Sequence, residues 1–189
     1  MPLTPSPKRT AASWITGSEE DWPQIADFGP SSLSAHARLL FLPDPEGTWQ
    51  SEADAPDLPS ALSGNDRLRL ALKVLSRHTT TPELAYFCLW DGWGTPIPDT
   101  ASLVRVPHRT YHLFEGALTD LGDWGTPSDE DPPLPAFIWP ADRTWCIAKD
   151  VDQHWAGIGA SEAALEDLRA IPELDIVKAD PTQPQPFYV

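Results

Sequence analysis

The clearest periodic pattern in the chain covers residues 65–77. Its apolar side chains recur at positions i, i+3, i+4 and i+7, the spacing of one face of an α-helix. They are Leu68, Ala71, Leu72 and Leu75. The threonines at 79–81 and Pro82 end the pattern. A second helix is predicted over residues 161–171, because Ser161 is a favourable N-cap and Pro172 stops the helix.

Short apolar runs elsewhere predict strands. Residues 84–90 are apolar on both faces, which is typical of a central strand covered on both sides. Pro107 separates two further strands, because its missing N–H prevents a continuous central ladder. Strands are also expected at residues 35–42, 103–106, 111–115, 145–151, 155–159 and 174–178, with 145–151 and 155–159 close enough to form a hairpin. A short helix is expected near residues 117–121.

The order of these elements predicts an α+β fold: a single domain with a largely antiparallel sheet and two main helices packed on it. We expect this domain to span residues 13–180, after a disordered tail at 1–12 and before a C-terminal tail at 181–189. Residues 14–30 are expected to form an irregular wrap pinned by aromatic rings. Two acidic loops containing proline are expected at 44–66 and 122–135.

Nine tryptophans in 189 residues are an unusual feature of this composition. We expect most of them in the core, where each buried ring contributes about 4–6 kcal/mol of hydrophobic stabilisation before entropy. The alternative is that one or two of the tryptophans line a ligand surface. Cys88 and Cys146 lie in apolar runs, so both are expected to be reduced and structural. The N-terminal residues lack the apolar segment of a signal peptide, and no stretch is long enough for a membrane span, so a cytoplasmic location is expected.

The charge balance restricts the class of partner. Asp and Glu outnumber Lys and Arg by 28 to 13, which gives a formal net charge of -15. Nucleic acids and anionic membranes require clustered cations, so neither is expected as a partner. The acidity suits a cationic protein partner, a divalent ion or simple solvation of the surface, and the sequence predicts no oligomeric state.

The best candidate ligand site gathers where predicted strands end. Its members are Trp90, Asp91, Trp93, His112, Glu115, Asp150 and Asp152. In an extended strand Asp150 and Asp152 point to one face, roughly 6.5–7 Å apart, so they could share an ion or divide acid and base roles. The alternative is that they form an ordinary turn. One interpretation is that Trp90 and Trp93 stack on a sugar, a planar ligand or a cationic ligand. The alternative is that Trp90 is a core residue and Trp93 covers the turn.

Other candidate motifs fail on spacing. His108 and His112 would lie roughly 13 Å apart on a strand, too far to share a metal. Gly157 and Gly159 precede a helix, but Glu162 stands where a dinucleotide fingerprint needs a third glycine, so we expect the glycines to make room for a neighbouring Trp. Hydrolase, metalloprotease and NTPase signatures are missing from the sequence. No catalytic residue, metal ligand or cofactor is therefore assigned.

Three segments resemble a family of uncharacterised, mainly actinobacterial cytoplasmic proteins. They are residues 79–94 (TTTPELAYFCLWDGWG), 111–116 (YHLFEG) and 139–161 (WPADRTWCIAKDVDQHWAGIGAS). The resemblance is strong over the second half of the chain and loose over the first half. It implies an α+β cytoplasmic protein, and it implies no reaction and no catalytic residue.

Two functional hypotheses follow. The first is a non-enzymatic acidic interaction protein, similar to immunity proteins that block cationic toxins, with carboxylates from residues 19–27, 44–57 and 123–131 on one face beside exposed aromatics. The second is a small-molecule or sugar binding protein or hydrolase whose Trp-lined pocket uses Asp91, His112, Asp150 and Asp152. Convergence of those four side chains in one concave site would favour the second hypothesis.

Overall fold

The computed structural model describes residues 2–94, 100–125 and 131–189. Nine strands of these residues form one sheet in which every pairing is antiparallel, with the order β1-β5-β3-β6-β7-β8-β2-β9 and β4 also paired to β5. The strands are β1 (Thr4–Pro5), β2 (Ala35–Leu40), β3 (Ala85–Trp90), β4 (Leu103–Val106), β5 (Arg109–Gly116), β6 (Phe137–Pro140), β7 (Cys146–Ala148), β8 (Trp155–Ala160) and β9 (Ile176–Lys178). The fold is therefore α+β with a largely antiparallel sheet.

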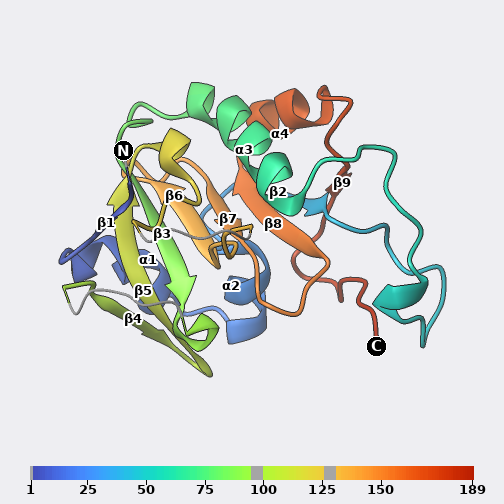
Figure 1. The fold of residues 1–189 in the computed structure, drawn as a ribbon, viewed down its shortest axis with the longest axis horizontal. Helices are drawn as coiled ribbons and strands as arrows, with labels where there is room; N and C mark the ends of the chain where they lie inside the picture. Colours follow the sequence, from blue (N-terminus) through green and yellow to red (C-terminus); the bar gives the residue numbers. More distant parts are fainter. Residues whose placement is uncertain (1, 95–99, 126–130) are drawn as a thin grey trace.

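Helices lie on both faces of the sheet (Figure 1). They are α1 (Ser13–Thr16), α2 (Trp22–Phe28), α3 (Gly64–Leu75) and α4 (Glu162–Arg169), with single 3-10 turns η1 (Arg9–Ala12), η2 (Glu52–Asp54), η3 (Ser76–His78), η4 (Asp91–Trp93) and η5 (Leu118–Asp120). The helix predicted at 65–77 is confirmed as α3, and all four of its predicted apolar positions are buried. Ser161 caps α4 as predicted, because its side chain accepts a hydrogen bond from the N–H of Ala164.

Alternating side chains of the central strand β3 pack into two hydrophobic cores, one on each face of the sheet. Phe87 and Leu89 face α3 and α4, while Tyr86 and Cys88 face the N-terminal segment and α1. This arrangement confirms the expectation of a strand apolar on both faces. Strands β7 and β8 form the predicted hairpin.

The N-terminal residues differ most from expectation. Residues 2–12 are not a disordered tail: β1 pairs with β5, and Leu3 is only 2% exposed. Main-chain hydrogen bonds order this segment, among them Leu3 N–H to the Asp123 carbonyl at 2.7 Å and Ser6 N–H to the Leu113 carbonyl at 2.8 Å. Hydrophobic content alone underestimates how ordered this segment is. The edge of β5 supplies hydrogen-bond partners for its backbone, and hydrophobic content does not register them.

The expected irregular wrap at 14–30 contains a regular helix, α2, which packs on β7 and β8. The close approach of α2 to β8 explains why this strand contains two glycines. A Cβ at position 157 would lie 1.7 Å from the Asp27 carbonyl oxygen, and one at 159 would lie 2.7 Å from the Leu33 side chain. These glycines therefore make room for α2 and the segment after it, and not for a tryptophan as expected.

The tryptophans divide into three groups. Trp124, Trp139, Trp145 and Trp155 are buried, and Trp14, Trp22 and Trp90 are half-buried. Trp49 and Trp93 are exposed. Within the described ranges, no helix is long and apolar enough to cross a membrane.

Candidate functional site

The predicted site residues lie mainly where β3 ends and β5 begins, beside the β7–β8 turn. Trp90 ends β3 opposite Tyr111, and η4 then carries Asp91 and Trp93. The β4–β5 hairpin turns through His108, whose φ of 68° is left-handed, and Arg109 begins β5. The predicted strand at 145–151 ends earlier, at Ala148, so Asp150 and Asp152 belong to the turn before β8.

The four predicted polar residues form two pairs and do not share one site. Nε2 of His112 lies 2.9 Å from Oδ1 of Asp91. Asp150 instead accepts hydrogen bonds from Arg109, at 3.3 Å from its Nε. Side chains alternate along β5, so His112 lies on the face of Phe114, whereas Arg109 lies on the opposite face with Tyr111 and Leu113.

Arg109 forms most of the contacts on its side of the cluster. No pattern in the sequence singles it out as a candidate. Its guanidinium lies 3.7 Å from Asp152 and 5.5 Å from the centre of the Trp90 ring. Trp93 meets Trp90 edge to face, with ring centres 5.6 Å apart. Arg109 and Asp150 are 41 residues apart in the sequence, so no local pattern connects this cation with its carboxylate partners.

Asp150 is held by its own turn as well as by Arg109. Oδ1 of Asp150 also accepts the Val151 N–H at 2.9 Å, which is the turn arrangement that the sequence left open. Burial raises the pKa of the Cys88 and Cys146 thiols, so neither is an activated nucleophile. Within the described ranges, no three His, Cys, Asp or Glu side chains are grouped so that they could hold a metal ion.

Glu115 lies apart from the other predicted residues. Its carboxylate accepts a hydrogen bond from the Ser6 hydroxyl at 2.7 Å and pairs with the Lys8 ammonium at 3.3 Å. Both partners belong to the N-terminal segment. Glu115 therefore attaches that segment to β5.

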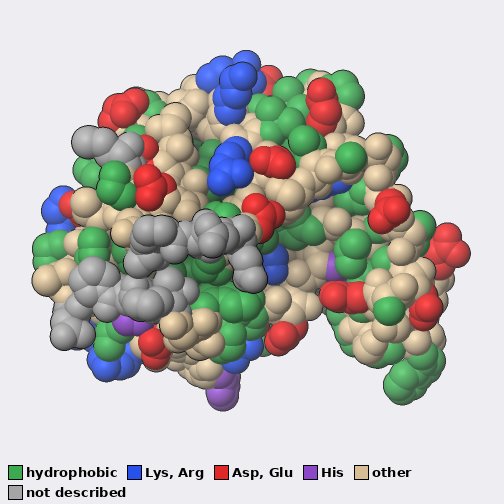
Figure 2. Space-filling model, viewed as in Figure 1, with side chains coloured by type: hydrophobic (Ala, Val, Ile, Leu, Met, Phe, Trp, Pro, Cys, Tyr) green, Lys and Arg blue, Asp and Glu red, His purple; other side chains and the backbone are tan. Residues whose placement is uncertain are grey.

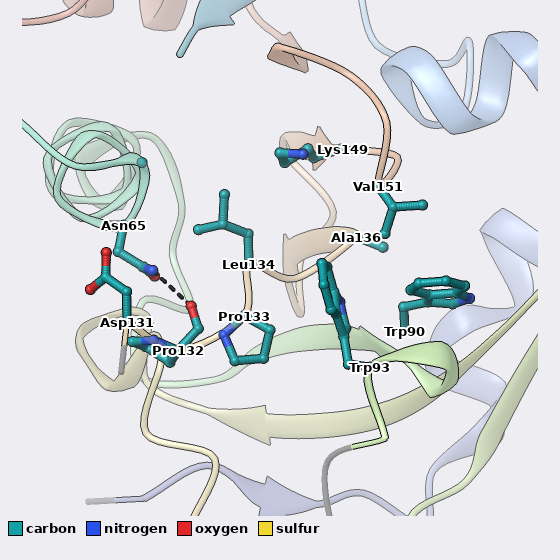
Figure 3. Close-up of a pocket in the computed structure, with 11 residues that line it drawn as sticks. Asn65, Trp90, Trp93, Asp131, Pro132, Pro133, Leu134, Ala136, Lys149 and Val151 are labelled. Atoms are coloured by element: carbon teal, nitrogen blue, oxygen red, sulfur yellow. Dashed lines mark hydrogen bonds between the residues drawn. The ribbon is translucent and has the colours of Figure 1, made fainter. Parts of the chain in front are cut away.

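Trp90 and Trp93 do line a pocket, of about 540 Å³, but with other polar groups than those predicted. Figure 3 shows Trp93 facing Leu134 and Pro133, with Trp90 behind it and Asn65 and Asp131 on the far side. The polar lining residues are Asn65, Asp131 and Lys149.

A second pocket, of about 620 Å³, continues from the first. The two share Gly64, Leu134, Lys149 and Val151, so together they form one groove with Lys149 where they meet. The Lys149 ammonium donates hydrogen bonds to the carbonyls of Asp150 at 3.0 Å and Gln153 at 3.2 Å. Burial lowers the pKa of Lys149, and the carboxylates of Asp150, Glu52 and Asp152 oppose that shift.

A separate feature projects beyond this groove. Residues 44–57 and 185–189 lie against each other and form what we call the acidic lobe (Figure 1). Tyr188 fixes its base by donating a hydrogen bond to the Pro43 carbonyl at 2.6 Å. Asp44 joins it to the sheet through Arg38, at 2.5 Å, and through His154 Nε2, at 3.2 Å.

The surface of the acidic lobe combines exposed rings with carboxylates. Trp49 is 84% exposed and Phe187 is 72% exposed, and both line a depression of about 570 Å³. Residues 39–66 and 179–189 contain no Lys or Arg. Figure 2 shows acidic side chains on the visible face of this lobe and a hollow between the lobe and the body of the molecule.

Comparison of the chain with protein-family models, with curated proteins and with solved structures found no match.

Proposed function

We propose that this protein is a non-enzymatic binding protein that recognises a cationic protein partner through its acidic lobe, as an immunity protein recognises a basic toxin. The observation that carries the proposal is Trp49. Its large apolar ring is 84% exposed and lines a depression formed by segments without Lys or Arg. Exposed Trp residues beside a depression are typical anchors of protein interfaces.

The backbone of Trp49 supports the same proposal. Its φ of 78° is in the left-handed region, which a bulky residue occupies at a cost of about 1–3 kcal/mol. Within the described residues the ring forms no aromatic or cation–π contact that would compensate for this strain. The turn therefore presents the indole outward at the expense of stability, which is characteristic of a functional position.

The charges around Trp49 select the partner. Glu46, Glu52, Asp54 and Asp57 belong to the lobe, and in the part of the chain that the structure describes none of them forms an ion pair. A surface of unpaired carboxylates attracts a basic protein at long range and repels an acidic one. The aromatic depression would then supply the short-range contact.

The arrangement of the predicted polar residues favours binding over catalysis. Asp91 is engaged by His112, and Asp150 is engaged by Arg109 and by its own turn. Asp91 pairs with His112, whereas Asp150 and Asp152 contact Arg109, so these contacts do not bring the four side chains together as the hydrolase hypothesis requires. We therefore propose no hydrolytic activity for this cluster.

The test is a comparison of variants in affinity capture. The unmodified protein should retain a basic protein from a cell lysate, and Trp49→Ala should weaken that complex about 30-fold, as expected for a central aromatic anchor. Trp93→Ala is the matched control, because Trp93 is also exposed but lies outside the lobe.

The charge contribution is tested in the same assay. The double variant Glu46→Lys, Glu52→Lys should release the partner, and raising the salt concentration should weaken the complex of the unmodified protein. Retention of only acidic proteins, or equal retention by the Trp49 and Trp93 variants, contradicts the proposal.

A further inference from the structure

Lys149 is an anomaly among the cations of this protein. The other Lys and Arg residues that the structure describes as buried or half-buried each have a carboxylate partner, and they are Arg38, Arg67, Arg109 and Arg169. Lys149 is half-buried and, among the described residues, lies within ion-pair distance of no carboxylate. Its ammonium uses two of its three donors on the Asp150 and Gln153 carbonyls, which leaves one donor for an anion in the groove.

A second feature of the groove is a flat apolar slot. One side of the Trp93 ring meets Trp90, and Figure 3 shows its other side facing Pro133 and Leu134 across the pocket. Trp93 remains 48% exposed, so its ring is accessible from solvent. An aromatic ring entering this slot would stack on the indole and lose its contact with water.

A third feature is an unsatisfied acceptor. Asn65 is 3% exposed and lines the pocket, and its amide N–H is used by the Pro132 carbonyl at 2.8 Å. This bond fixes the orientation of the amide, and its Oδ1 atom has no hydrogen-bond partner among the residues that the structure describes. A buried acceptor without a donor is costly, so a donor on a ligand would stabilise it.

The start of α3 contributes to the same wall. Gly64 and Asn65 are its first two residues, and both line the pocket. The first N–H groups of a helix have no intrahelical acceptors, and the helix dipole makes that end favourable for negative charge. Asp66 in the first turn of α3 and Asp131 in the pocket lining oppose the dipole, so the Lys149 ammonium is the group that attracts an anion.

We infer that the groove binds a small aromatic carboxylate that carries an N–H or O–H donor. Its ring lies between Trp93 and Leu134, its carboxylate meets the Lys149 ammonium near the start of α3, and its donor meets Oδ1 of Asn65. The pocket volume of about 540 Å³ is in the range of small-molecule sites. The first pocket, which holds the ring and the Asn65 contact, contains no residue of the acidic lobe, whereas Glu52 and Tyr188 of the lobe line the second pocket. The inference does not depend on the proposed protein partner.

The test is calorimetric titration of the full chain with indole-3-acetate and with indole-3-acetamide. These probes share a flat ring with an N–H donor, and only the first carries a negative charge. Indole-3-acetate should bind, and the amide should bind about 10- to 100-fold more weakly, because a charge-assisted hydrogen bond is lost. Equal affinities, or no heat from indole-3-acetate at about 10 mM, overturn the inference.

Variants locate the site. Trp93→Ala should weaken indole-3-acetate binding about tenfold through loss of stacking, and Lys149→Met should abolish the preference for the acid over the amide. Trp49→Ala is the matched control and should bind like the unmodified protein, since Trp49 lies on the lobe. Unchanged affinity in Trp93→Ala overturns the inference even where Lys149→Met fails to fold, because Trp93 is an exposed residue whose loss leaves the core intact.

Discussion

At the scale of single residues, Gly157 illustrates how a missing side chain positions an element. The carbonyl oxygen of Asp27 occupies the space that a Cβ at 157 would need, at 1.7 Å. This contact is with a backbone atom, so a rotamer change cannot relieve it. The last turn of α2 approaches β8 closely only because position 157 is glycine.

Gly157→Ala should therefore destabilise the protein by about 3 kcal/mol or more, through displacement of α2 from the sheet. Urea unfolding followed by tryptophan fluorescence measures the change. Gly47→Ala is the control, because a Cβ at position 47 would meet nothing within 4 Å, and its effect should stay within about 0.5 kcal/mol. Similar losses in both variants would contradict this account of the contact.

The site residues show which lining residues of a pocket can be predicted from the sequence. The sequence allows Trp90 and Trp93 to be either ligand-stacking rings or a core residue and a lid, and in the structure both line a pocket. The polar groups of that pocket, Asn65 and Lys149, were not identified, because they come from α3 and from the end of β7, remote in sequence from η4. Only the fold brings those segments together.

At the scale of elements, Arg67 joins three segments. Arg67 lies outside the apolar i, i+3, i+4, i+7 pattern of α3, yet the structure buries it to 2% exposure. Its guanidinium donates hydrogen bonds to the Ser60 carbonyl at 2.7 Å and to Asp175 at 3.0 Å. It thus links α3 to the loop before it and to the segment before β9.

Arg67→Ala should cost about 3–5 kcal/mol, because it removes a buried guanidinium and leaves the Asp175 carboxylate and the Ser60 carbonyl without their donor. Arg69→Ala is a matched control on the same helix. Arg69 pairs with Asp66 at an exposed position, so its removal should cost about 1 kcal/mol or less. Chemical denaturation of both variants tests this prediction, and equal midpoints would show that the buried network contributes nothing specific.

Elements with strong local signals were predicted well, and elements that depend on partners were missed. The α3 and α4 helices have periodic faces and stop signals. Strand β6 has four residues, ends at a proline and follows a proline-containing loop, so it lacks a clear strand pattern. It forms because β3 and β7 lie on either side of it.

At the scale of the whole molecule, two helical layers on one sheet bury polar groups as well as rings. The N-terminal segment completes the second layer, which the hydrophobic pattern alone could not indicate. His36 is half-buried beside Phe28 of α2, and His154 is buried against Tyr188 of the C-terminal segment. Burial lowers the pKa of both histidines, although Asp180 opposes the shift of His36 and Asp44 opposes that of His154.

A lowered histidine pKa makes folding sensitive to mild acid. Below the ordinary value of 6.5, the unfolded chain takes up protons that the folded protein resists, so stability falls as the pH drops from 6.5 toward the folded-state values. The loss is at most about 1.4 kcal/mol per pH unit for each histidine. The carboxylates of Asp44 and Asp142, whose pKa values are lowered, contribute stability that is lost only below pH 3.8.

Urea unfolding of the unmodified protein and of His36→Gln, His154→Gln at pH 7.5 and at pH 5.5 measures the histidine contribution. Glutamine at 154 retains an amide donor for Asp44 but cannot be protonated, so the double variant should lose less stability between the two pH values. Asp27, whose pKa burial raises, acts with the opposite sign in both proteins and cancels in the comparison. His108→Gln is the exposed control, and a pH response in the double variant equal to that of this control would show that the buried histidines do not set the acid sensitivity of the fold.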